Sequence, residues 1–341
     1  MNLKNFYRVN KNLQKDIKKS HRELKNPDRE IIFAVPGSKV FISKYYKNSP
    51  NSFLNISLTG HKCDLLCKHC KGILLKDMLD LNDHGASFNY DKFNYNKNSD
   101  NRILNILDGF SEGKVGGVLL SGGFTKNGNL PLDGQIYKEI KEVKSKFGSG
   151  MKIFIHLGFV DGDTAASLKD SNIDGVLVNI IPDKNAIENV YNLKGFNKDD
   201  YYTTIEILKN AGLKVSPHII IGISGGRIMG EFEAIDEISR IGVDSIVFVL
   251  LKKISNQVNL NSSEVKTTEI LDLFNYAEKL MPATPKVLGC ARPVSLESSN
   301  LEVTLLKNGL STIAFPSEEA IEFVINNNLK YKFIEQCCAF V

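Results

Sequence analysis

Short apolar runs alternate with amphipathic stretches from residue 117 to residue 327 of this 341-residue chain. The apolar runs predict strands over 117–120, 152–156, 175–179, 214–221, 245–250, 286–288 and 312–315. The amphipathic stretches predict helices over 134–146, 164–169, 199–211, 231–241, 267–280, 297–307 and 318–327. Strands that are apolar throughout and separated by helices are typical of a parallel sheet with both faces covered.

A further apolar run over 53–58 precedes this pattern and brings the number of strand–helix units to roughly eight. Parallel sheets of that size close into barrels, so we expect an α/β fold with a full or nearly full (β/α)8 barrel. Helical segments are also expected over 73–81 and 101–112, with a polar surface loop over 82–100 between them.

The first 50 residues differ from the rest. Residues 1–30 predict a polar helical arm that ends at Pro27. The apolar segments 30–37 and 40–43 predict a β-hairpin, because a Pro-Gly turn ends the first of them. We therefore expect an extension over 1–50, made of the helical arm and the hairpin, and a barrel with a C-terminal tail over 51–341.

Three cysteines, Cys63, Cys67 and Cys70, follow the apolar run in a C-x3-C-x2-C spacing. Thiolates are the usual ligands of iron–sulfur clusters, and three of them on a four-iron cluster leave one iron open for a small molecule. A zinc site is the alternative, with His61 or His69 as the fourth ligand. A disulfide framework is disfavoured, because six cysteines in 341 residues are sparse and no secretory signal precedes them.

The cysteine spacing resembles the signature of the radical S-adenosylmethionine (SAM) superfamily, in which an aromatic-type residue, here His69, precedes the last cysteine. The resemblance implies a barrel of the radical SAM type, as in biotin synthase. It also implies a [4Fe-4S] cluster on Cys63, Cys67 and Cys70, with SAM bound to the fourth iron. One electron from the cluster would then cleave SAM to methionine and a 5′-deoxyadenosyl radical, while the protein orients the substrate and excludes water.

Other polar residues end predicted strands, where parallel barrels place their active sites. The superfamily resemblance implies that Ser121, Gly122 and Gly123 bind the amino group of SAM, although Phe124 follows where an acidic residue is usual. An ordinary βα turn would also use these glycines. The resemblance further implies adenine contacts from the strand segment that runs from Ile219 to Gly222.

Three more strand-end residues, His156, Asn179 and His218, are candidates for contacts with SAM or substrate at the barrel mouth. A single histidine is more often structural than catalytic. Two histidines at the ends of neighbouring strands make better candidates.

The remaining cysteines are Cys290, Cys337 and Cys338, the last two adjacent and close to residue 341. Free cysteines are often buried as small apolar residues. Because this pair does not fit that role well, we expect a second, auxiliary iron–sulfur cluster on the three cysteines. Arg292 is a candidate neighbour or ligand, since biotin synthase uses an arginine on its auxiliary cluster.

The whole chain resembles biotin-synthase-like radical SAM proteins, a group related to the two-component lipoyl synthase of archaea. The matching segments are 33–37, 57–60, 121–123, 289–293 and the cysteine pair at 337–338. The resemblance implies sulfur insertion at an unactivated carbon, octanoyl to lipoyl, with the auxiliary cluster as the sulfur source. The alternatives are a radical rearrangement or carbon–carbon reaction, and a zinc- or cluster-binding regulator without turnover. Segment 251–256 departs from related proteins, which carry a Pro and a Gly-Thr there, so the shared substrate is in question.

Charge and hydropathy limit the partners. The net charge is +4, from 43 basic and 39 acidic residues, and makes no case for nucleic acid. No apolar run is long enough to span a membrane, and the N-terminus lacks the apolar segment of a signal peptide. We expect a cytoplasmic enzyme that acts on a small molecule or a protein-bound acyl group. Its expected partners are an electron donor such as ferredoxin or flavodoxin, and a second radical SAM protein.

Overall fold

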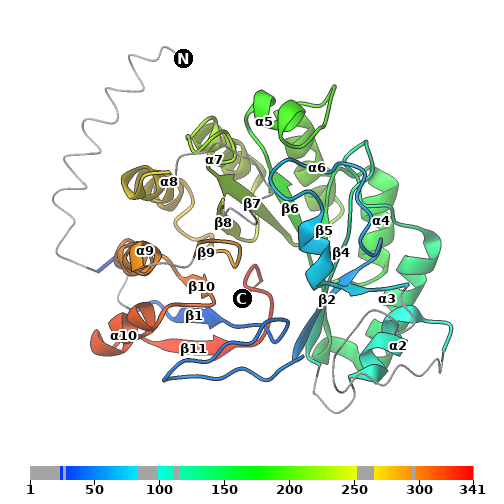
Figure 1. Ribbon diagram of the computed structural model, residues 1–341, viewed down its shortest axis with the longest axis horizontal. Helices are drawn as coiled ribbons and strands as arrows, with labels where there is room; N and C mark the ends of the chain where they lie inside the picture. Colours follow the sequence, from blue (N-terminus) through cyan, green and yellow to red (C-terminus); the bar gives the residue numbers. More distant parts are fainter. Residues whose placement is uncertain are drawn as a thin grey trace.

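The computed structural model describes residues 24–25, 28–82, 99–110, 115–251, 265–293 and 296–340 (Figure 1). The side chains of residues 296 and 297 are not described. Most of the predicted helical arm, most of the loop predicted over 82–100, and all of segment 251–256 except Leu251 lie outside these residues. The division of the chain at residue 50 therefore stays a prediction.

Eleven parallel strands form one curled sheet in the order β11-β1-β10-β9-β8-β7-β6-β5-β4-β2-β3. The strands are β1 (Ile31–Ala34), β2 (Phe53–Ser57), β3 (Leu79–Asp80), β4 (Gly117–Ser121), β5 (Lys152–Leu157), β6 (Gly175–Ile180), β7 (Val215–Ile221), β8 (Ile246–Leu250), β9 (Lys286–Leu288), β10 (Thr312–Ala314) and β11 (Tyr331–Ile334). The outermost strands, β11 and β3, do not pair with each other, so the barrel is not closed by hydrogen bonds.

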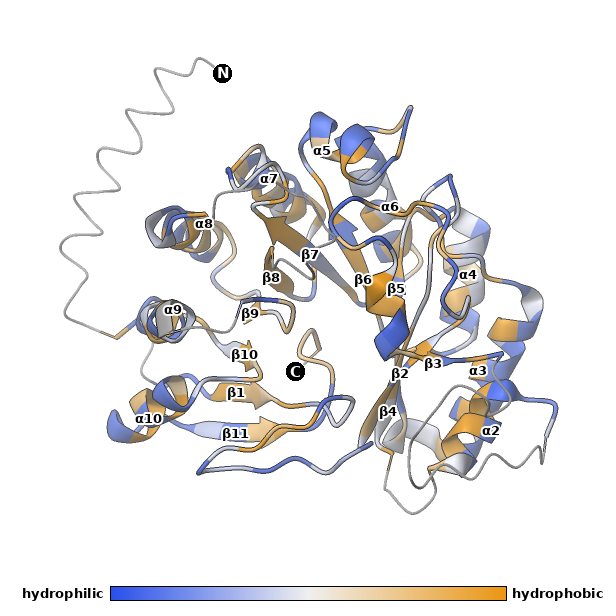
Figure 2. Cartoon of the chain, viewed as in Figure 1, coloured by the Kyte–Doolittle hydropathy of each residue, from blue (hydrophilic) through white to orange (hydrophobic). Residues whose placement is uncertain are grey.

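Helices lie outside the sheet and cover its outer face (Figure 1). They are α2 (Arg102–Gly109), α3 (Gly134–Phe147), α4 (Gly162–Asp170), α5 (Lys184–Asn189), α6 (Lys198–Asn210), α7 (Glu231–Ile241), α8 (Thr267–Leu280), α9 (Leu296–Lys307) and α10 (Glu318–Asn326). Alternate strand residues, such as Ile155, Val176 and Val215, pack against helix residues such as Ile140 and Ile205 in the main apolar core. Figure 2 shows the hydrophobic residues concentrated on the strands and on the sides of the helices that face them.

The predicted α/β fold with a parallel barrel-like sheet is confirmed. All seven apolar runs from residue 117 onward are strands, and the helices α7 and α8 have the predicted bounds. The sheet is larger than expected, because short strands at both ends of the chain, β1 and β11, extend it beyond β10. The sequence prediction also missed β3 and α5, which have two and six residues.

The hairpin predicted over 30–43 is wrong. Strand β1 instead pairs in parallel with β10 and β11, and Ile42 forms only an isolated bridge with Lys47. The segment after β1 is held by the buried amide of Asn48, which donates to the carbonyls of Val35 and Lys39. The apolar character of β1 is therefore used in the interior of the sheet and not in a local turn.

The helix predicted over 73–81 is also wrong. The segment forms a 3₁₀ helix over Ile73–Asp77 and then the short strand β3. In β3 and just beyond it, Leu79 and Leu81 are buried while Asp80 between them is partly exposed. This alternation is that of a strand, and Leu79 pairs with Ile56 at the open edge of β2.

The C-terminal tail enters the interior of the barrel, where Figure 1 places the end of the chain inside the ring of strands. Phe340 stacks on Phe154 with ring centroids 5.0 Å apart, and a Cβ at Gly175 would lie 2.5 Å from its ring. The hydroxyl of Ser245 donates to the carbonyl of Ala339 over 2.5 Å. Since Gly175 begins β6 and Ser245 precedes β8, the tail fills the amino-terminal end of the barrel.

Among the described residues, no helix combines the length and the apolar character that crossing a membrane requires.

Candidate functional site

The cysteine loop begins where β2 ends and lies against the turn that follows β4. The amide of Leu58 donates to the carbonyl of Ser121 over 2.7 Å, and the amide of Gly123 donates to the hydroxyl of Thr59 over 2.7 Å. The amide of Asp64 donates to the carbonyl of Phe124 over 2.9 Å. These bonds place the three cysteines at the carboxyl ends of the parallel strands, where barrels carry their active sites.

Gly123 is required by the cysteine loop itself. A Cβ at this position would contact the carbonyl oxygen of Lys62 and lie 2.5 Å from the Cα of Cys63. At Gly122 a Cβ would lie 2.9 Å from the hydroxyl oxygen of Thr59. The Gly-Gly pair, predicted to make room for SAM, therefore first makes room for the loop that carries the cysteines.

The other side of the cysteine loop rests on the segment that follows α5. The amide of Lys68 donates to the carbonyl of Val190 over 2.7 Å, and the side-chain amide of Asn192 donates to the carbonyl of Leu65 over 2.6 Å. The thiol of Cys67 lies 3.7 Å from the carbonyl oxygen of Tyr191. The loop is thus held between the segments that follow β4 and β6, which fixes its shape without a bound group.

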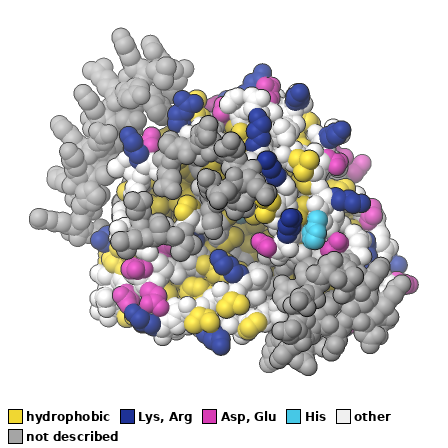
Figure 3. All heavy atoms as spheres, viewed as in Figure 1, with side chains coloured by type: hydrophobic (Ala, Val, Ile, Leu, Met, Phe, Trp, Pro, Cys, Tyr) yellow, Lys and Arg dark blue, Asp and Glu magenta, His cyan; other side chains and the backbone are white. Residues whose placement is uncertain are grey.

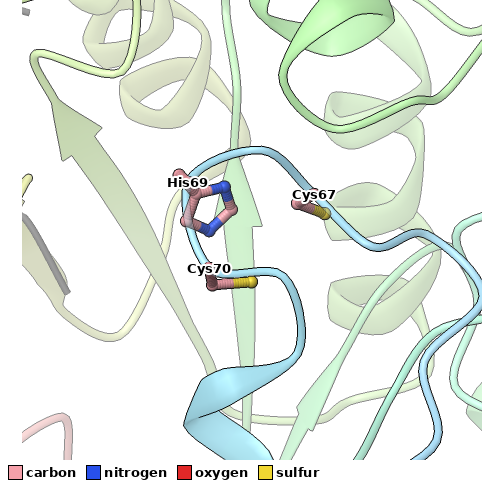
Figure 4. A group of neighbouring side chains, drawn as sticks. All are labelled: Cys67, His69 and Cys70. Carbon is pink, nitrogen blue, oxygen red and sulfur yellow. The ribbon is translucent and has the colours of Figure 1, made fainter. Parts of the chain in front are cut away.

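Cys67, His69 and Cys70 form the centre of the site. Their ligand atoms all lie within 4.8 Å of one another, and Figure 4 shows the three side chains gathered at the turn that precedes the 3₁₀ helix. A hydrogen bond from the Cys67 thiol lowers the pKa of Cys70 to about 4, and the same bond raises the pKa of Cys67. A lowered pKa at Cys70 favours the thiolate form, which is the form that binds metals and clusters.

Cys63 is half-buried and packs against the same apolar cluster as Cys67 and Cys70. Its thiol lies 3.9 Å from the carbonyl oxygen of Phe124, and it is not one of the three side chains whose ligand atoms lie within 4.8 Å of one another. The imidazole Nδ1 of His69 is buried and has no hydrogen-bond partner among the described residues. His61, the other histidine considered as a zinc ligand, is exposed to solvent. Three sulfur donors together with a buried, unpaired imidazole nitrogen fit an iron–sulfur centre, and they also fit a tetrahedral zinc ion.

The two predicted histidines meet inside the barrel, but the prediction that they end neighbouring strands is wrong, because His218 lies in the middle of β7 and β6 separates β7 from β5. The rings of His156 and His218 lie 5.8 Å apart edge to face, and Nε2 of His156 is 3.1 Å from Oδ1 of Asn179. Burial lowers the pKa of both histidines, in the case of His218 to about 3. Both rings are therefore neutral at physiological pH, and they present uncharged polar groups to a ligand. Phe124 lies between them and the cysteine loop, 6.2 Å from the His156 ring.

The strand predicted to contact adenine offers few free groups. Ile219 pairs with Ile180 on one side and Phe248 on the other, and its side chain is fully buried. Its backbone is thus committed to the sheet, and the expected adenine contact from Ile219 is not supported. Gly222 lies just beyond the strand with a φ of 87°, in a turn closed by a bond from the Gly226 amide. Of Ile219 and Gly222, only Gly222 lies beyond the end of β7, where its backbone is not part of the sheet.

The second group of cysteines comes from two distant segments. Cys290 follows β9, while Cys337 and Cys338 lie in the buried tail that enters the barrel. A hydrogen bond from Cys338 lowers the pKa of Cys337, and the charge of Cys337 contributes, after burial, to raising the pKa of Cys290. Cys290 is exposed to solvent, whereas Cys337 and Cys338 are buried. The charges of the three thiols influence one another, but within the described residues only Cys67, His69 and Cys70 bring three ligand atoms within 4.8 Å of one another.

Arg292, predicted to act near the second group of cysteines, is committed elsewhere. Its Nη1 donates to the carbonyls of Gly289 and Ala314, over 2.9 and 2.6 Å. Its Nη2 donates to the carbonyl of Phe315, and Nε and Nη2 both donate to the carboxylate of Glu302. Each nitrogen of this buried guanidinium thus has a protein partner, so the catalytic or ligand role is not supported. Arg292 instead fixes the loop that carries Cys290.

The sequence prediction missed several residues that build the site. Thr59, Tyr191 and Asn192 hold the cysteine loop, and Phe124 separates it from the histidines. Thr59 lies in the matched segment 57–60, and Phe124 was noted only as the residue that follows the Gly-Gly pair. Tyr191 and Asn192 follow a short polar helix with no periodic signal, and their role depends on contacts more than 120 positions away.

No protein-family model matches the chain, and a search of curated proteins finds no match. Solved structures share its fold. One is HydG, a maturase of the [FeFe]-hydrogenase, with a TM-score of 0.56, 12% identity, and coverage of 90% of this chain and 65% of that one. HydG from Carboxydothermus hydrogenoformans has a TM-score of 0.57 and 15% identity, and the match covers 94% of this chain and 71% of that one. Methylornithine synthase has a TM-score of 0.50 and 14% identity, and the match covers 82% of this chain and 83% of that one. This chain thus spans about two thirds of the length of HydG.

Proposed function

We propose that this chain is a radical SAM enzyme that reductively cleaves S-adenosylmethionine and abstracts hydrogen from a substrate held in the barrel. The observation that carries the proposal is the cysteine loop. Two thiols and the His69 imidazole gather at the carboxyl end of a parallel barrel, and Cys63 lies on the same loop. The shared fold with HydG and methylornithine synthase, a maturase and a synthase, supports an enzyme.

Cys63, Cys67 and Cys70 would hold a [4Fe-4S] cluster. When bound with SAM, that group supplies one-electron cleavage of the sulfonium to methionine and a 5′-deoxyadenosyl radical. His69, the turn over 121–123 and Gly222 lie at the same end of the barrel and would position SAM.

The interior of the barrel would orient the substrate. His156, Asn179 and His218 offer neutral donors and acceptors there, and they carry no fixed charge that would attract an ion. The buried tail closes the amino-terminal end of the barrel, so substrate would enter from the cysteine-loop side. Exclusion of water by this closed end protects a reactive radical.

Cys290, Cys337 and Cys338 would hold an auxiliary iron–sulfur cluster, and we propose sulfur insertion into an octanoyl-type chain as the reaction. The proximity of these thiols inside the barrel supports it, because a sulfur source must face the substrate carbon. A neutral interior suits an acyl chain. If the substrate is an octanoyl group bound to protein, a second radical SAM protein would be the partner. A rearrangement or carbon–carbon reaction would need the cysteine loop alone.

The electron for SAM cleavage would come from a ferredoxin or flavodoxin. Such donors are acidic, and exposed lysines surround the cysteine loop at Lys62, Lys68 and Lys76. Figure 3, which has the same view as Figure 1, shows lysine and arginine side chains scattered over this face of the molecule. Attraction of opposite charges would speed the encounter of the two proteins at low salt.

The test is anaerobic purification, metal analysis and incubation with SAM and a reductant. Formation of 5′-deoxyadenosine supports the proposal, and its absence from iron-loaded protein contradicts it. Zinc in place of iron would favour a metal-binding regulator, the second candidate, since His69 lies within ligand distance of two thiols. An octanoyl-lysine peptide tests the reaction class, and the absence of a thiolated product would rule out lipoyl-type sulfur insertion.

A further inference from the structure

Two tyrosine hydroxyls near the cysteine loop have no partner. The hydroxyl oxygens of Tyr191 and Tyr201 are buried and make no hydrogen bond within the described part of the chain. An unpaired buried hydroxyl is costly, and most buried polar groups in proteins are paired. Two such groups in one place indicate that something bound there accepts hydrogen bonds from them.

Both tyrosines belong to the apolar cluster that contains Cys67, against which Cys63 and Cys70 pack. The Tyr191 ring lies 4.8 Å from the His69 ring, and its carbonyl is the neighbour of the Cys67 thiol. Tyr201 projects from α6 into the same cluster, and its ring lies 4.8 Å from that of Phe159. The two phenols therefore lie in the same apolar cluster as Cys67, and Tyr191 packs directly against His69.

The hydroxyls keep their protons there. The ordinary pKa of a tyrosine hydroxyl is about 10, so the group is protonated at neutral pH. Each is therefore available as a donor at any physiological pH, and the nearby acceptors that a bound cluster would add are its sulfur atoms.

We propose that Tyr191 and Tyr201 donate hydrogen bonds to sulfur atoms of the cluster held by Cys63, Cys67 and Cys70. This inference rests on the proposed function, because it needs that cluster. Hydrogen bonds to sulfur reduce its negative charge and favour the reduced state, so the two tyrosines raise the reduction potential of the cluster.

The chain offers a matched control. Tyr202 is the next residue of α6, and its hydroxyl is also buried and unpaired among the described residues. Its side chain lies in the main core on the other face of the helix, where its charged neighbours are Glu233 and Glu237. Tyr202→Phe therefore removes an equivalent hydroxyl that does not face the thiols.

The experiment is a redox titration of the cluster by electron paramagnetic resonance, without SAM so that contacts to SAM do not contribute. At the wild-type midpoint, the ratio of reduced to oxidised cluster should fall about three- to tenfold in Tyr191→Phe and in Tyr201→Phe, the effect of one hydrogen bond. Tyr202→Phe should titrate as wild type. Equal midpoints in all four proteins would overturn the inference.

A second measurement covers variants that fail to retain the cluster. Wild-type protein grown with ring-deuterated tyrosine should show deuterium couplings to the reduced cluster, and the lack of any coupling would overturn the inference. A wild-type chain that takes up no iron would overturn the proposed function and this inference together. An intact wild-type cluster with unchanged potentials in the two variants would overturn this inference alone.

Discussion

The two groups of cysteines are built in different ways. Cys63, Cys67 and Cys70 lie within eight positions on one loop, which backbone hydrogen bonds hold against the turns after β4 and α5. Cys290 and the pair Cys337–Cys338 come from segments more than 40 positions apart, and the pair is placed by apolar packing of the tail. The first group depends on local spacing, whereas the second depends on the completed barrel.

This difference means that the two groups should fail separately. Loss of the tail should separate the cysteines of the second group and leave the cysteine loop intact. Segments Val190–Asn192 and Gly123–Phe124 support that loop, and within the described residues no hydrogen bond joins the tail to them. The central account therefore places SAM cleavage in the first group and the reaction's specificity in the second.

The largest effect is expected from the first group. Alanine at Cys63, Cys67 and Cys70 together should remove about four irons per chain and reduce 5′-deoxyadenosine formation to background, because the open iron that binds SAM is lost. Metal analysis and product chromatography measure both. Residual SAM cleavage in the triple variant would show that Cys63, Cys67 and Cys70 are not required for it, and would contradict the roles assigned to the two cysteine groups.

The second group should give a narrower loss. Cys337→Ala should lower the iron content to about four per chain and stop sulfur insertion, while SAM cleavage continues. Alanine is chosen because the site is buried and apolar, so folding tolerates it. A wild-type content of about four irons, unchanged by this substitution, would remove the auxiliary cluster from the account.

Substitutions at two glycines should disturb the two cysteine groups separately, because each glycine packs against a segment that carries only one of them. Gly123→Ala would push a Cβ against the backbone of Cys63, which cannot move freely. It should lower the free energy of unfolding by roughly 1–3 kcal/mol and should also abolish SAM cleavage. Gly175→Ala would meet only the ring of Phe340, so it should displace the tail and spare SAM cleavage. Thermal unfolding and iron content measure both variants. Equal losses of SAM cleavage would show that the tail supports the loop after all.

The histidines between the groups should give the smallest effect, seen in the pH dependence of stability. The folded pKa of His218, about 3, lies below its ordinary value, so its contribution is full above about pH 6.5 and is lost as pH falls toward 3. Wild-type stability should therefore fall by up to about 1.4 kcal/mol per pH unit more steeply than that of His218→Gln. Denaturant unfolding between pH 7 and pH 4.5 tests this, and parallel curves would contradict it.

Much of the barrel was predictable because each strand and helix carries its own periodic signal. The errors concern elements without one. Strand β11 has only four residues, two exposed and then two half-buried, so it shows no alternation. Strand β1 was assigned to a hairpin although its partners lie about 280 to 300 positions away. Sequence adjacency favoured the hairpin, but the completed sheet offered β1 two neighbours in place of one.

The candidate site divides in the same way. The spacing of Cys63, Cys67 and Cys70 predicted one metal-binding loop, and the structure brings Cys67 and Cys70 together there with His69. The auxiliary cluster on the remaining cysteines stays a prediction. Arg292 lies near Cys290 as predicted, but its partners Glu302 and Phe315, supplied by α9 and the end of β10, could not be read from the sequence. Tyr191 gave no signal, since its contacts to the loop exist only after the barrel forms.

The most direct test is electron paramagnetic resonance of the reduced, iron-loaded protein with and without SAM. The account predicts a [4Fe-4S] signal whose g values change when SAM is added, because SAM binds the iron that the three cysteines leave open. A signal that SAM leaves unaltered would contradict coordination at an open iron, and with it the assignment of the cysteine loop as the site of SAM cleavage.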